Sequence, residues 1–221
     1  METEILPNLE MRNQLIEAYI RYLGEHGQPP VTVTRFCKDN GFDEGSFFKE
    51  FGSFDALEAA FWGGLVSRVA DAVKAGAEWN GFAARERYLA FLYAFVEHSL
   101  GNRSMLQLRL KGVSPFTRFP ALRKMEARFK EFADMVVSHG VSTGEIADRG
   151  LLRSFYPDAL YIHFRGVTQF NLQDDSEGYE RTDEFVEKTV TFAFELIRSQ
   201  AIDSAFDLGK FLFRGAVEGE A

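Results

Sequence analysis

The chain has 221 residues, which is enough for one large domain or for a small domain joined to a larger one. Its hydrophobic (46%) and charged (26%) fractions are those of an ordinary globular protein, and its net charge of −8 argues against nucleic-acid binding by the surface as a whole. The single cysteine, Cys37, excludes an internal disulfide and fits a reducing compartment. We expect a cytoplasmic protein without a signal peptide or membrane-spanning segment, because the first residues are acidic and no long apolar run follows.

Two longer helices are predicted on either side of a short central motif. Residues 9–26 have apolar side chains at helical spacing, and Gly27 then stops the helix. Residues 54–78 continue the same kind of spacing and form a helix that would join the first part of the chain to the rest. Gly63-Gly64 weakens the middle of this helix, since glycine in a helix interior costs about 1 kcal/mol relative to alanine, and suggests a bend there.

The central motif, TVTRFCKDNGFDEGSFFKEFGSFDAL at residues 32–57, has the spacing of two short helices followed by the start of a third. Thr32 can cap the first short helix, and Asn40-Gly41 ends it because both residues tolerate a left-handed backbone. Asp43 can cap the second short helix, and Gly52-Ser53 separates it from the third. Two short helices joined by a glycine-containing turn are the unit that places a recognition helix in the DNA major groove.

This motif resembles the N-terminal domain of TetR-family regulators, whose usual pattern is T-V-x-x-I-A-x-x-A-G-V-S-x-G-T-x-Y-x-x-F-x-S-K-x-x-L. The residues that match it in register are Thr32, Val33, Gly41, Gly45, Phe51, Ser53 and Leu57. Conservative replacements at five further positions are Phe36, Cys37, Phe42, Asp43 and Ser46. The resemblance implies an all-α fold with an N-terminal three-helix helix-turn-helix head at residues 1–53. It also implies a larger helical ligand-binding and dimerisation domain at residues 54–202, which leaves a C-terminal tail at residues 203–221.

The resemblance further implies which side chains would face DNA. These candidates are Thr34, Arg35, Lys38, Ser46, Phe48 and Lys49. Three positions depart from the family pattern: Phe48 replaces a Tyr, Phe54 replaces a Lys, and Glu44 stands where family members often have Lys or Arg. Residues 1–60 hold 5 Lys and Arg against 11 Asp and Glu, a net charge of −6. DNA affinity depends largely on cations that displace counterions from phosphates, so this head has less electrostatic attraction for DNA than usual.

The rest of the chain is predicted to be helical throughout. The expected helices span residues 82–100, 103–111, 119–138, 157–172 and 182–199, with a solvated polar loop at Asp174-Asp175-Glu177. The resemblance implies that the last two helices pair with their symmetry mates in a homodimer. Phenylalanine accounts for 23 of the residues, which indicates either a Phe-rich core or a pocket lined with aromatic groups for an apolar ligand. The candidate pocket residues are Phe91, Phe95, His98, Phe129, His163 and Phe164.

Charge is distributed unevenly along this second part of the chain. Residues 102–130 carry 8 basic residues and one acidic residue, Glu126, whereas residues 131–221 carry 8 basic against 17 acidic residues. Two interpretations stay open. The basic segment pairs with acidic helices of the folded dimer, or it meets an anionic partner: a ligand carboxylate or phosphate, or an anionic membrane surface.

Signatures of catalysis and metal binding are missing from the sequence. The four histidines lie far apart, and no phosphate-binding loop, dinucleotide fingerprint, GxSxG or CxxC motif occurs, so we expect no catalytic site, cofactor or metal. The sequence therefore predicts a homodimeric transcriptional regulator that binds operator DNA and is controlled by an apolar small molecule. The alternative is a TetR-fold lipid-binding or membrane-associating accessory protein that has lost DNA binding. Phe54 distinguishes the two hypotheses, because a Phe54 packed inside the head is core, whereas an exposed one favours a protein or membrane partner.

Overall fold

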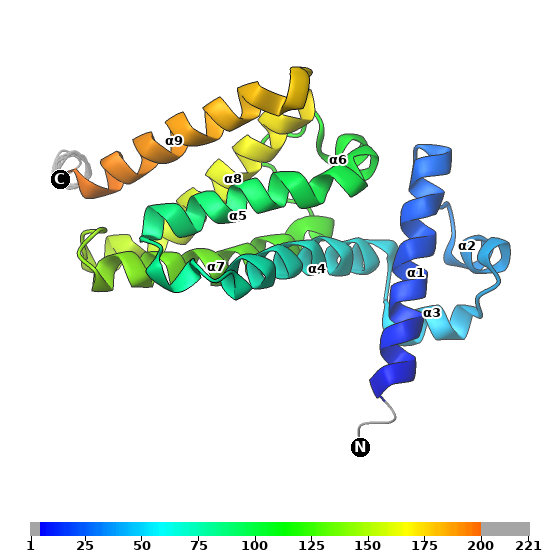
Figure 1. The fold of residues 1–221 in the computed structure, drawn as a ribbon. Helices are drawn as coiled ribbons and strands as arrows, with labels where there is room; N and C mark the ends of the chain where they lie inside the picture. The colour runs from blue at the N-terminus through cyan, green and yellow to red at the C-terminus, as the bar shows by residue number, and fades with distance from the viewer. Residues whose placement is uncertain (1–4, 200–221) are drawn as a thin grey trace, which may run out of the picture.

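The computed structural model describes residues 5–199, and within that range the chain forms α-helices and short 3-10 turns without a β-strand. The helices are α1 (Ile5–His26), α2 (Val33–Asn40), α3 (Glu44–Glu50), α4 (Phe54–Ala75), α5 (Ala84–Ser99), α6 (Arg103–Leu110), α7 (Arg123–Ser142), α8 (Tyr156–Gln173) and α9 (Glu180–Arg198). Figure 1 shows α1, α2 and α3 as a separate head at one end of the molecule, with α4 running from it into the body formed by α5 to α9. The all-α fold expected from the sequence is confirmed. The expected tail lies outside the described residues.

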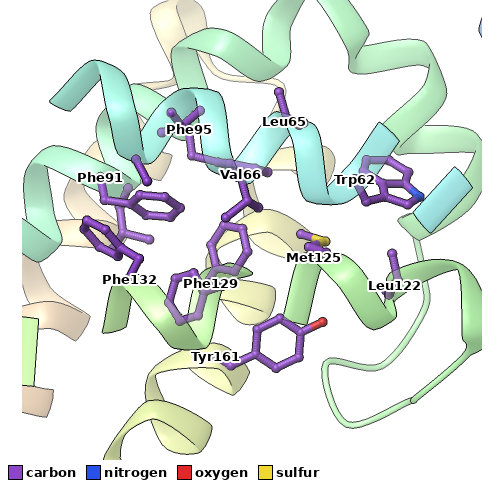
Figure 2. Packing of buried hydrophobic residues seen from close by; sticks show 14 of the residues in the cluster. Trp62, Leu65, Val66, Phe91, Phe95, Leu122, Met125, Phe129, Phe132 and Tyr161 are labelled. Atoms are coloured by element: carbon purple, nitrogen blue, oxygen red, sulfur yellow. The ribbon is translucent and has the colours of Figure 1, made fainter. Parts of the chain in front are cut away.

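The body is held together by a core in which α4 lies against α7, and α7 lies against α8. Figure 2 shows Val66 of α4 directed toward Phe129 of α7, whereas Leu65 points to the other side of α4. These three side chains are buried, as are Trp62 and Met125, and burial of a large apolar side chain stabilises a fold by about 1.5–3 kcal/mol. This packing fixes the end of α4 from which the head projects.

Gly63 of α4 lies directly against the backbone of α7 at Lys124. A Cβ atom at Gly63 would lie 2.8 Å from Lys124 Cβ, which is closer than carbon atoms pack, so only glycine fits without a shift of the helix. At Gly64 the nearest atom to such a Cβ would be Nη1 of Arg68, at 3.2 Å, which is the flexible end of a side chain. The helix α4 is continuous from residue 54 to 75 through both glycines. We conclude that Gly63, and not the pair, provides space between the two helices.

The loop before α9 differs from its prediction at Asp174. Its carboxylate is buried, and it accepts hydrogen bonds from the backbone N–H groups of Ser176 (3.0 Å) and Thr182 (2.8 Å) and from both hydroxyls (2.7 Å each). Burial by itself would raise the pKa of Asp174, but the hydrogen bonds from Thr182 and Ser176 outweigh it and hold the pKa well below its usual range. The prediction of a solvated loop was wrong for Asp174, because its carboxylate accepts hydrogen bonds from backbone N–H groups around the start of α9. Asp175 and Glu177 are exposed, as predicted.

Candidate DNA-binding head and ligand-binding body

The two short helices of the head are fixed by local hydrogen bonds that the sequence predicts. Thr32 Oγ1 accepts from Arg35 N–H at 3.2 Å and caps α2, and Gly41 ends that helix with a left-handed backbone of φ 73°. Asp43 Oδ2 accepts from Ser46 N–H at 2.8 Å and caps α3. A helix cap of this kind contributes about 1 kcal/mol, so the turn between the helices is well defined.

Phe54 is half-buried and packs against the aromatic core of the head. Its ring stacks on Tyr19 of α1 with centroids 5.3 Å apart, and it meets the edges of Phe36 at 5.5 Å and Phe47 at 5.4 Å. Aromatic pairs at these distances add about 0.5–1.5 kcal/mol each beyond the apolar area they bury. By the criterion set from the sequence, Phe54 is core, and the observation does not favour a protein or membrane partner at this position.

The candidate DNA-contacting residues lie on the outer surfaces of α2 and α3. Those exposed to solvent are Thr34, Arg35, Lys38, Phe48 and Lys49, whereas Ser46 is half-buried. Arg35 is paired with Asp39 at 3.5 Å, and the Ser46 hydroxyl donates to Asp43 Oδ2 at 3.3 Å. The Phe48 ring is 50% exposed, although one edge meets the buried ring of Phe47. The structure thus brings Phe48 and Lys49 together on the open face of α3, beside the acidic side chain of Glu44 at its start.

A buried polar cluster that the sequence analysis missed joins the head to the body. Glu58 of α4 is only 1% exposed, and its two carboxylate oxygens accept from the Tyr19 hydroxyl of α1 at 2.5 Å and from Arg109 Nε of α6 at 3.1 Å. Burial, followed by the hydrogen bond to Glu58, raises the pKa of Tyr19 far above its usual range, so the tyrosine stays a donor. A carboxylate placed among apolar residues in the sequence LEAAF was the signal that could have identified this cluster. Its three members tie α1, α4 and α6 together.

Four of the six candidate pocket residues form one aromatic cluster in the body. Phe129 of α7 stacks on Phe164 of α8 with centroids 4.6 Å apart, and Phe91 and Phe95 of α5 meet Phe164 edge-on at 5.6 and 4.6 Å. All four rings are buried. They fill the space between α5, α7 and α8, and Figure 2 shows three of them beside the α4–α7 contact.

The two candidate histidines are not part of this aromatic contact. His98 lies exposed near the end of α5, with Nδ1 2.8 Å from the carbonyl of Ala94 one turn earlier. His163 lies between helices, with Nδ1 2.7 Å from the Tyr88 hydroxyl of α5 and Nε2 2.8 Å from the Thr189 hydroxyl of α9. Burial lowers the pKa of His163 to about 4, so its ring is neutral at pH 7.

Sequence comparison identifies the body. Residues 87–212 match the family model described as the C-terminal domain of tetracyclin repressor-like proteins, which is more than half of the chain. The chain belongs to the TetR family. No curated protein matches it. Among solved structures, the TetR-family protein is similar to a putative tetR family transcription regulator from Shewanella sp. PV-4, with a TM-score of 0.58 and 13% identity over 83% of this chain and 95% of that chain.

Two further structures have the same fold. A protein of unknown function from Rhodococcus sp. RHA1 has a TM-score of 0.56 and 18% identity, covering 86% of this chain and 96% of that one. The regulator FadR from Bacillus subtilis, solved in complex with stearoyl-CoA, has a TM-score of 0.55 and 14% identity, covering 84% and 97%. Identities this low establish a shared fold and nothing finer. In the described part of this TetR-family chain, no helix is long and apolar enough to cross a membrane, and no three His, Cys, Asp or Glu side chains gather as a metal site.

Proposed function

We propose that this TetR-family protein is a homodimeric transcriptional regulator that binds operator DNA through α2 and α3 under the control of an apolar ligand. The observation that carries the proposal is the geometry of α3. Its start is capped by Asp43, its Phe47 is buried in the head, and its Phe48 and Lys49 are exposed at the end of the molecule. A helix held by one face and open on the other is the arrangement that enters a major groove.

Exposed apolar side chains on the last two helices support the homodimer. Ile162 of α8 and Phe192 and Leu196 of α9 are all exposed, and Phe192 is 66% accessible to solvent. Single exposed apolar residues are common on protein surfaces, but a set on two neighbouring helices is typical of an interface. We propose that α8 and α9 pair with their counterparts in a second copy, which would place two heads on one operator.

For the ligand, we propose the aromatic cluster of Phe91, Phe95, Phe129 and Phe164 as the apolar site. Its rings are buried between helices of the body, and an apolar ligand would enter by parting them. The structurally similar FadR was solved with stearoyl-CoA, which makes long acyl chains the first ligands to test. A ligand that parts α5, α7 and α8 would act on α4 through its packing against α7. The Glu58 cluster would then transmit the shift to α1 and the head.

The proposal is tested by titrating the purified protein with a pool of genomic DNA fragments over a range of salt concentrations and sequencing what is retained. We expect enrichment of a palindromic site with affinity that falls steeply as salt rises. Lys49→Ala should weaken binding to that site and lower the salt slope by about 1 if Lys49 contacts a phosphate. Lys111→Ala, which removes an exposed lysine from the body, is the matched control.

Two outcomes count against the proposal. Unchanged affinity of Lys49→Ala would remove Lys49 from the interface. No enrichment at any salt concentration would mean that the acidic head does not bind DNA, and vesicle binding would then be measured to test the lipid-binding alternative.

A further inference from the structure

A cleft of about 590 Å³ lies between the head and the body, bounded by α1 on one side and by α4 and α7 on the other. It is separate from the aromatic cluster, and its lining includes none of the candidate DNA-contacting residues. Figure 1 shows α1 passing beside the beginning of α4, where the head meets the body. Four of its lining side chains are cationic: Arg12 of α1, Arg68 of α4, and Lys124 and Arg128 of α7. The only carboxylate in the lining is Glu17.

Two of these four cations are left without an ion pair by the described residues. Arg68 and Lys124 have no carboxylate of the described chain within 4.0 Å, whereas Arg128 is paired with the exposed Glu131 at 2.8 Å. Arg12 is 3.6 Å from Glu50 and lies over the Phe51 ring at 4.3 Å, so it is held in place by the head. Burial, and then the positive charges of Arg12, Arg123 and Arg128, lower the pKa of Lys124. Like charges gathered in this way repel one another until an anion separates them.

The packing of the helices builds the floor of the cleft. Gly63 lets the backbone of α7 approach α4 at Lys124, which brings the two helices' cations to the same side. Gly64 leaves room for the Arg68 guanidinium, since a Cβ there would be 3.2 Å from Nη1. Asn13, Ser67 and Asn102 add neutral hydrogen-bonding groups to the lining. Cations, amides and a hydroxyl around one concave space are the groups that hold phosphate oxygens.

We propose that this cleft binds a multivalent phosphate, namely the di- or triphosphate group of a small molecule, which bridges α1 of the head to α4 and α7 of the body. The site accounts for one cation of the basic segment, Lys124, that has no ion pair among the described residues. Arg109 is paired with Glu58, and Lys130 with Glu126 and Asp158, whereas Lys124 and Arg128 face the cleft. Four cations from three helices favour an anion with several charges over a single carboxylate, because each added charge reaches another cation.

The regulatory consequence rests on the proposed function. An anion held between Arg12 on one side and Lys124 and Arg68 on the other would resist any change in the angle between head and body. It would therefore change operator affinity without touching DNA or the aromatic cluster. The binding itself requires neither DNA nor an apolar ligand.

The test is isothermal titration of the full chain at low ionic strength with pyrophosphate, ATP and orthophosphate, in the absence of DNA. Arg68→Gln/Lys124→Gln removes two cleft cations. The matched control is Lys111→Gln/Arg118→Gln, which removes one lysine and one arginine from the exposed loop before α7. We expect pyrophosphate or ATP to bind more tightly than orthophosphate, and the cleft variant to bind at least about tenfold more weakly than wild type and control. Binding of ATP but not pyrophosphate would identify a nucleotide as the source of the phosphates.

Equal affinities in the cleft variant and the control would overturn the proposal, as would the failure of wild type to bind either pyrophosphate or ATP. If the cleft variant instead lost operator affinity with a shallower salt slope while wild type bound no phosphate, Arg68 and Lys124 would be DNA contacts and the proposal would also be wrong. If the protein binds phosphate but the genomic DNA pool yields no operator, this site stands and the proposed function is refuted. The two proposals therefore fail separately.

Discussion

His163 makes the stability of the body depend on pH between neutral and mildly acidic conditions. Its ring nitrogens meet two uncharged hydroxyls, Tyr88 on α5 and Thr189 on α9, and Thr189 donates its own proton to the Phe185 carbonyl at 2.7 Å. The oxygen of Thr189 therefore accepts from His163 Nε2–H. In the neutral ring Nδ1 then accepts from Tyr88, whose hydroxyl lies closer to Nδ1 (2.7 Å) than to the Leu160 carbonyl (3.1 Å). The neutral ring satisfies these contacts, whereas a protonated ring would be a half-buried cation whose two hydrogen-bond partners are both uncharged.

The sign and size of the effect follow from the two pKa values of this histidine. Burial lowers the pKa from 6.5 to about 4 in the folded protein, so the unfolded chain binds a proton first as the pH falls. The contribution of His163 is fully present above pH 6.5 and is lost progressively as the pH falls towards 4. Between pH 7.5 and pH 5 this loss amounts to about 2 kcal/mol of unfolding free energy.

The assay is urea unfolding of wild type and His163→Gln at a series of pH values from 7.5 to 5. The variant should be less stable at pH 7.5, because Tyr88 and Thr189 lose their partner, but its stability should fall less with pH by about 2 kcal/mol. His98→Gln controls for the removal of an exposed histidine. Equal pH dependence in wild type and His163→Gln would refute the reasoning, and would mean that the ring is accessible to water or protonated in the fold.

Two further predictions concern packing. Gly63→Ala should lower the free energy of unfolding by about 1–3 kcal/mol, because its methyl group would clash with Lys124. Gly64→Ala should leave the free energy of unfolding unchanged or raise it by up to about 1 kcal/mol. Thermal denaturation of the two variants measures both effects, and equal losses would contradict the assigned contact between α4 and α7. Phe192→Glu should convert the dimer to a monomer in size-exclusion chromatography with light scattering. The control Phe116→Glu, at a 74% exposed position in the loop between α6 and α7, should keep the dimer. A dimeric Phe192→Glu protein would place the interface elsewhere.

The helices of the head could be predicted because the interactions that define them are local. Thr32 and Asp43 each cap a helix by accepting from the backbone N–H three residues ahead. Gly41 supplies a left-handed backbone at the turn, so short stretches of sequence contain all the groups involved. The helices of the body were predicted from apolar spacing for the same reason. The start of α9 was not predicted by local pattern, because one of its backbone N–H groups, that of Thr182, donates to Asp174, eight residues earlier in the chain.

Composition and motif spacing were enough to predict an all-α, TetR-like chain with an acidic head and a Phe-rich body that contains a basic segment. Where those features act depends on contacts between distant parts of the chain. Phe54 became core because Tyr19, Phe36 and Phe47 converge on it, and Glu58 became a link because Tyr19 and Arg109 approach it from two other helices. The cleft cations are separated by more than a hundred residues, from Arg12 to Lys124, and no local pattern relates them. They meet because Gly63 allows α4 and α7 to pack closely at the point where α1 passes beside α4.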